Sequence, residues 1–192
     1  AAGILASILG SQLVRVKEGG DPGRALNIGT ILTCIIFAGF AAAVVFGGGF
    51  STGLYIASVA GVLIGLLIGY TTNFFTSDLY QPVRNVPKYS ESGSAINIIT
   101  GFSQGLLSIV PSIVGIIAAM LVAYFSAEAY GISGIYGVAV AAVGMLSITG
   151  MVVSADAYGP IADNAKGIAE MSDLGEEVVA NTDALDSAGN TA

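Results

Sequence analysis

Long apolar stretches without a charged residue dominate most of the chain. They cover residues 25–77, 92–127 and 129–155, and a glycine-rich break at 47–53 divides the first of them. A helix that crosses a bilayer needs about 20 apolar residues. The pattern therefore predicts four membrane spans, at 25–46, 54–75, 97–124 and 131–155.

The apolar run 1–14 is too short to cross a bilayer, so we expect it to be the second half of a span in a larger protein. The runs do not alternate apolar and polar residues, which excludes β-barrel strands. The predicted fold class is all-α: a multi-pass transmembrane helix bundle with about four full spans and one partial span, as a fragment of a larger bundle.

Composition supports a membrane protein and excludes several other classes. Of 192 residues, 54% are hydrophobic and only 10% are charged, whereas soluble domains are about 25% charged. This excludes a soluble enzyme, and also disorder, which requires polar, charged chains. A single cysteine and no histidine exclude a disulfide scaffold and Cys/His metal sites. Because the net charge is -7, we expect no nucleic-acid partner.

Charge divides the chain into two parts. Residues 1–155 are neutral, with five acids and five bases, whereas residues 156–192 hold eight acids and one base. We expect transmembrane helices with short loops in 1–155 and an acidic helical segment in 156–192. The bases before 155 lie in two loops, 15–24 and 84–88, separated by two spans. By the positive-inside rule these loops are cytoplasmic, and two further spans bring the acidic segment to the cytoplasmic side.

The acidic segment begins as a continuation of the last span. Asp156, Asp163 and Glu170 are seven residues apart and so share one helix face, with Lys166 close to it and a bend expected at Pro160. A solvated amphipathic helix is one interpretation of this pattern. For Asp156 and Asp163 a functional role is favoured, because an ionisable group at the membrane end of a helix is costly unless it is paired, hydrated or metal-bound.

A second group of oxygen-bearing side chains follows. Asp183, Asp186 and Asn190 are spaced by three and four residues, which places them on one helix face. Carboxylate and amide oxygens without His or Cys suit Mg²⁺, which completes its coordination with water and substrate phosphates. The alternative is that Asp183 or Asp186 is only a charge near a helix N-terminus.

These two blocks resemble the signatures of a known family. The run 156–171 (DAYGPIADNAKGIAEM) closely resembles a conserved stretch of membrane-bound, ion-pumping pyrophosphatases, and 182–191 (TDALDSAGNT) is similar to the stretch that follows it there. The runs 75–77 and 82–84 resemble a loop of the same family. Lys166 departs from the pattern, because the family usually has a small residue at this position.

The resemblance implies a homodimeric membrane protein that hydrolyses Mg-pyrophosphate at the cytoplasmic side and pumps H⁺ or Na⁺. It implies Mg²⁺ as a cofactor, K⁺ in some members, and pyrophosphate and the lipid bilayer as partners. Asp163 matches a magnesium-site aspartate, and Asp186 and Asn190 match positions that serve the metal or the attacking water. Asp156 matches an acidic position just below that site. The expected location is a cell inner membrane or an acidic-organelle membrane.

The resemblance also indicates that this segment holds a minority of the catalytic site, so we expect it to be inactive alone. A divalent-cation transporter or channel is the alternative function, because carboxylates at a membrane mouth would serve it too. A structural membrane subunit with a solvated acidic tail is a third possible function.

Overall fold

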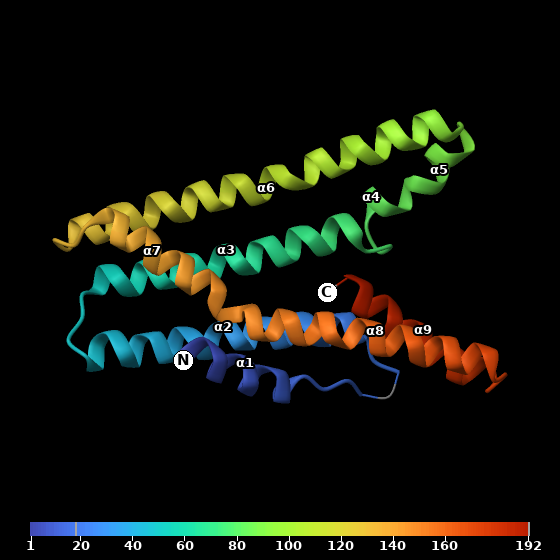
Figure 1. Cartoon of the computed structure of the whole chain (residues 1–192), viewed down its shortest axis with the longest axis horizontal. Helices are drawn as coiled ribbons and strands as arrows, with labels where there is room; N and C mark the ends of the chain where they lie inside the picture. The colour runs from blue at the N-terminus through green and yellow to red at the C-terminus, as the bar shows by residue number, and fades with distance from the viewer. Residues whose placement is uncertain (18, 192) are drawn as a thin grey trace.

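A computed structural model describes residues 1–17 and 19–191 of the chain. Within these residues the regular structure is helical, with no strand (Figure 1). This confirms the predicted all-α fold class. The elements in chain order are α1 (Ala2–Leu13), α2 (Pro22–Gly47), α3 (Thr52–Thr76), α4 (Gln81–Arg84), α5 (Val86–Glu91), α6 (Ser94–Ala129), α7 (Gly134–Met145), the 3₁₀ turn η1 (Leu146–Ile148), α8 (Thr149–Met171) and α9 (Glu176–Thr191).

Four helical segments are long and apolar enough to cross a membrane, as the sequence predicts. They contain the predicted spans almost completely: Pro22–Gly47, Thr52–Arg84, Ser94–Ala129 and Gly134–Met171. The predicted break between the first two spans is confirmed, because α2 ends at Gly47 and α3 begins at Thr52. Helix α6 continues through Pro111, and α8 continues through Pro160.

The last span differs from the single helix expected over 131–155. It begins at Gly134 and is divided by η1, after which α8 continues to Met171. Helix α1 lies directly against this turn: the Ser7 hydroxyl donates to the Ser147 carbonyl at 3.3 Å, and a Cβ at Gly3 would lie 2.7 Å from the Ser147 Cα. The 3₁₀ turn, a form of helix used in short pieces, thus lies at the point where α1 packs closely against the last span.

Small residues let the spans approach one another. Helix α3 lies beside α6 and α7, and α7 passes from the α6 side of the molecule to the α2 side (Figure 1). Where α3 crosses α7, Gly61 faces the Ala141 backbone and Gly144 faces the Ser58 backbone, with no room for a Cβ at either glycine. Such close backbone contact replaces the hydrophobic driving force that is missing in lipid.

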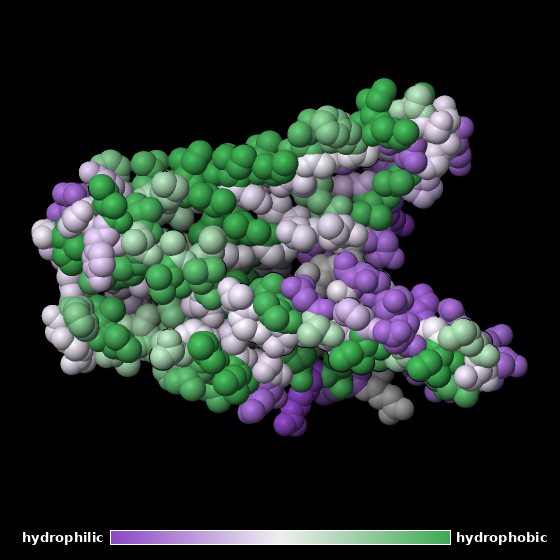
Figure 2. All heavy atoms as spheres, viewed as in Figure 1, coloured by the Kyte–Doolittle hydropathy of each residue, from purple (hydrophilic) through white to green (hydrophobic). Residues whose placement is uncertain are grey.

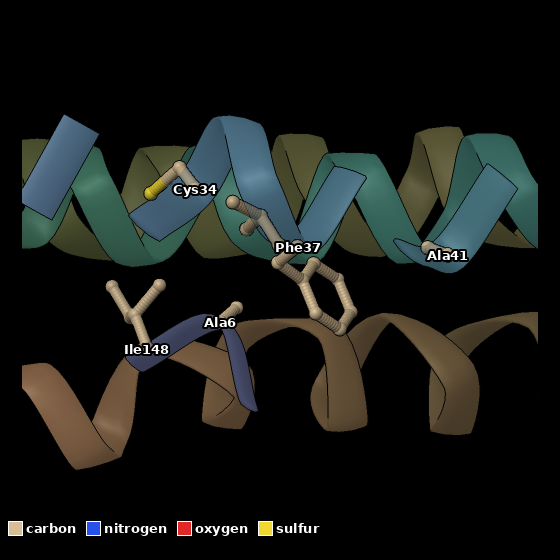
Figure 3. Packing of buried hydrophobic residues seen from close by; sticks show 6 residues of the cluster. Ala6, Cys34, Phe37, Ala41 and Ile148 are labelled. Atoms are coloured by element: carbon tan, nitrogen blue, oxygen red, sulfur yellow. The ribbon is translucent and has the colours of Figure 1, made fainter. Parts of the chain in front are cut away.

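One buried cluster joins α1, α2, α3 and η1. Ala6 and Ile148 lie across from the α2 side chains that Figure 3 labels. The members of the cluster are Ala6, Cys34, Phe37, Ala41, Val62 and Ile148. Because Ile148 belongs to η1, the cluster fixes the point from which α8 starts.

The two ends of the bundle differ in polarity. The α1–α2 loop, the α3–α6 connection and the α8–α9 hairpin lie at one end, where polar residues gather, and the α2–α3 and α6–α7 loops lie at the other (Figures 1 and 2). The basic loops 15–24 and 84–88 therefore share an end, as predicted. Helix α6 is exposed along most of its length, and only 6% of its most apolar stretch is buried. Its apolar side chains are therefore free to contact lipid or further helices.

Candidate functional site

The candidate site lies on the hairpin formed by α8 and α9. Helix α8 ends at Met171, and a short turn containing Asp173 (φ 50°) and Gly175 (φ 93°) reverses the chain. The two helices then cross in close contact, because a Cβ at Gly189 would lie only 2.7 Å from the Gly159 Cα. The missing side chains at this crossing bring the polar residues of α9 against α8.

Polar contacts of Tyr158 and Lys166 also join the two helices. The Tyr158 hydroxyl donates to the Leu185 carbonyl at 3.3 Å. The Lys166 ammonium contacts Asp183 Oδ1 at 2.5 Å and Asp186 Oδ2 at 3.4 Å. The sequence placed Lys166 near the face of Asp163 and Glu170. In the structure its ammonium instead contacts the two carboxylates of α9, because α8 turns this side chain toward its partner helix.

Asp186 is the most enclosed acidic group of the segment. The residue is only 7% exposed, and its two carboxylate oxygens have different donors. Lys166 Nζ donates to Oδ2, and Asn190 Nδ2 donates to Oδ1 at 2.9 Å. Burying a carboxylate is costly unless charges or hydrogen bonds compensate it. These two donors therefore explain how Asp186 is accommodated, and they also fix its orientation.

The structure brings some of the predicted site residues together. Asp183, Asp186 and Asn190 lie on one face of α9, as their spacing predicts. Since α9 begins at Glu176, Asp183 and Asp186 lie beyond its first turn, and the alternative of a charge at a helix N-terminus is wrong. Asp156 and Asp163 are exposed on α8.

The donor set fits a hard divalent cation in kind. Carboxylate and amide oxygens are the ligands that Mg²⁺ prefers. In number they are too few: within residues 1–17 and 19–191, no group of three or more His, Cys, Asp or Glu side chains could hold a metal ion. The described residues therefore do not form a complete metal site, and metal binding by Asp163, Asp183, Asp186 and Asn190 stays a prediction.

A cavity of about 550 Å³ opens beside the hairpin. It is lined by the α1–α2 loop with the start of α2, by the end of α3 with the turn that follows, and by α9. Charged and polar groups in its wall include Asp21, Arg24, Asn27 and Asp78. Segments that are distant in the sequence therefore meet at this cavity, and the part of α9 that lines it comes directly after Asp183.

The sequence did not reveal that Lys166 forms ion pairs with the acidic residues of α9. The one indication was that Lys166 is the single base among eight acids in 156–192. Such a residue is expected to pair, but helical spacing within α8 cannot reveal a partner on α9. Tyr158 was missed for the same reason, since its acceptor lies 27 residues away.

A bundle of long apolar helices that carries an acidic helical hairpin at its polar end is typical of an integral membrane protein. The sequence profile of the family described as inorganic H⁺ pyrophosphatase matches residues 1–192. The chain belongs to this family, which confirms the resemblance seen in the motifs.

Curated relatives agree with this assignment. The chain is 43% identical over 98% of its length to a putative K⁺-stimulated pyrophosphate-energized sodium pump of Clostridium tetani, of which it covers 28%. It is 41% identical, over its whole length, to a K⁺-insensitive pyrophosphate-energized proton pump of Caldanaerobacter subterraneus, of which it covers 29%. The chain thus spans less than a third of the length of these relatives.

Proposed function

We propose that the complete protein containing this chain is a membrane pyrophosphatase that hydrolyses Mg-pyrophosphate and pumps H⁺ or Na⁺ across the membrane. The observation that carries the proposal is the family match over residues 1–192, joined to a buried, doubly hydrogen-bonded carboxylate at Asp186. Relatives with both sodium-pump and proton-pump names support ion pumping as the output.

The side chains of the hairpin have distinct proposed roles. Asp186 and Asp163 offer carboxylate oxygens, and Asn190 an amide oxygen, for binding a divalent cation, with Asp183 and Asp156 as secondary positions. Bound Mg²⁺ supplies charge neutralisation for the phosphate oxygens and lowers the barrier to attack by water. Asp186 also serves as a proposed catalytic group, because a fixed carboxylate can orient a water molecule and accept its proton.

We propose that this site faces the cytoplasm. The hairpin shares its end of the bundle with the basic loops 15–24 and 84–88 (Figure 1), and basic loops are retained on the cytoplasmic side. The proposed location is a cell inner membrane or an acidic-organelle membrane. The proposed assembly is a homodimer of the complete protein, and K⁺ is a proposed further cofactor, since relatives include K⁺-stimulated pumps.

The proposed function is tested in sealed membrane vesicles that carry the complete protein. Mg²⁺-dependent phosphate release from pyrophosphate and internal pH are followed together. We expect Asp186→Asn and Asp163→Asn each to reduce phosphate release by about 10²-fold or more, the scale typical of a lost catalytic electrostatic interaction. Asp173→Asn is the matched control, because it removes an exposed charge from the α8–α9 turn and is expected to leave the rate within about twofold of the wild type.

The outcomes separate the candidate functions. Release coupled to acidification of the lumen identifies proton pumping, and release coupled to Na⁺ uptake identifies sodium pumping. If well-folded wild-type protein releases no phosphate from pyrophosphate, the enzyme proposal is wrong. Transport of a divalent cation in the same vesicles would then favour the alternative.

A further inference from the structure

Lys166 is placed where it can influence the proposed metal site. It is the one base in residues 156–192, and its ammonium reaches across from α8 to two carboxylates of α9. Its side chain is 26% exposed, so it is neither fully buried nor free in solvent. The residue belongs to α8, whereas both of its acidic partners belong to α9.

The two carboxylates that Lys166 contacts have different environments. The Asp183 side chain is 59% exposed, whereas that of Asp186 is 10% exposed. Water can replace Lys166 at the exposed carboxylate with little cost. Among the described residues, the ammonium and the Asn190 amide donate to the enclosed carboxylate of Asp186. Lys166 lies closer to Asp183, at 2.5 Å, than to Asp186, at 3.4 Å, but only at Asp186 does it compensate the burial of a carboxylate.

We propose that Lys166 is a positioning residue that holds the Asp186 carboxylate when no metal is bound and competes with a divalent cation for it. The inference rests on the proposed function of the same site. A cation that binds Asp186 needs the oxygen lone pairs that the ammonium now engages. Two positive centres about 4 Å apart repel by several kcal/mol even at an intermediate effective dielectric constant of about 20. A divalent cation held by Asp186 would therefore compete with the ammonium for this carboxylate.

Competition predicts two opposite effects when the charge is removed. Lys166→Gln removes the competing cation, so a divalent ion should bind more tightly. The same change leaves the Asp186 carboxylate with one donor fewer, so its orientation is less fixed and kcat should fall. A role limited to joining α8 to α9 would lower stability without tightening metal binding, so the sign of the affinity change distinguishes the two roles.

The direct test measures Mn²⁺ binding to the complete protein in lipid nanodiscs without pyrophosphate, by the electron paramagnetic resonance signal of free Mn²⁺. Asp186→Asn identifies the part of the binding that depends on Asp186. For that part we expect Lys166→Gln to lower the dissociation constant by about three- to fivefold, the upper end of the scale of one partly exposed charge interaction. Lys166→Arg, which keeps the charge, should stay within about twofold of the wild type.

Lys88→Gln is the matched control, because it removes an exposed lysine charge from α5 and should leave the dissociation constant unchanged. An unchanged or weaker Asp186-dependent affinity in Lys166→Gln overturns the proposal, as does the absence of any Asp186-dependent Mn²⁺ binding in the wild type. The proposed function fails separately, if the wild type does not hydrolyse Mg-pyrophosphate.

A second measurement needs only the wild-type protein and so does not depend on the folding of a variant. Displacement by metal should free the Lys166 amine, so its labelling by an amine-reactive reagent should rise with Mn²⁺ concentration, as followed by mass spectrometry. Labelling of Lys88 provides the reference and should not change. Lys166 labelling that does not respond to Mn²⁺ contradicts displacement.

Discussion

The crossing of α8 and α9 gives a sharp test of how backbone packing supports the site. We consider Gly189→Ala. The new Cβ would lie 2.7 Å from the Gly159 Cα, which is a backbone atom and cannot turn aside. Carbon atoms normally approach to about 3.5–4.0 Å, so the helices must separate locally by about 1 Å.

This separation should affect both stability and catalysis. Overpacking of a close contact costs about 1–3 kcal/mol, whereas replacing a helical glycine with alanine contributes up to about 1 kcal/mol in the opposite direction. The net effect is a modest loss of stability. A displacement of about 1 Å at a catalytic group can cost about 10²-fold in rate. Because Asp186 and Asn190 flank Gly189 on α9, we expect activity to fall much more than stability.

Gly167→Ala is the matched control in the same hairpin. A Cβ at Gly167 would meet nothing within 4 Å, so this variant gains helix propensity without a clash and should keep wild-type activity. The assays are Mg²⁺-dependent pyrophosphate hydrolysis by the complete protein and its midpoint of thermal unfolding in detergent. If Gly189→Ala matches Gly167→Ala in both assays, the close crossing does not support the site and the reasoning is refuted.

Two further predictions concern the bundle itself. Gly61→Ala should lower the thermal midpoint of the complete protein, because its Cβ would overlap the Ala141 backbone. In the same helix, a Cβ at Gly69 would meet nothing within 4 Å, so Gly69→Ala should leave the midpoint unchanged. Equal midpoints for the two variants would contradict close packing of α3 on α7. Glu128→Ala removes the carboxylate that accepts from the Gly134 backbone N–H at 2.8 Å at the start of α7. It should cost about 1 kcal/mol, and a thermal midpoint equal to that of the wild type would show that water replaces this cap.

The spans were predictable because their signal is local. An uninterrupted apolar run of sufficient length specifies a transmembrane helix by itself, and the glycine-rich stretch at 47–53 marks its own turn. The division of the last span at η1 was not predictable, and it lies where α1 passes against Ser147. Nothing in the local sequence of 146–148 reveals that crossing.

The site was predictable to the extent that it follows helical spacing. Asp183, Asp186 and Asn190 share a face of α9 as their spacing requires. The pairing of Lys166 with α9 depends on how two helices cross, which periodicity within one helix does not contain. The assignments of Asp163 and Asp156 to metal and catalysis stay predictions from the family resemblance.

The short turn between α8 and α9 has a consequence for how the protein is made. The polar contacts between α8 and α9 join residues that are close in sequence, because Lys166 and Asp186 are only 20 positions apart. Short loops close at low entropic cost and form quickly. The ribosome need deliver only the residues through Asn190 for Asp186 to acquire both of its donors. We therefore expect this corner of the site to assemble during translation, ahead of contacts with segments synthesised later.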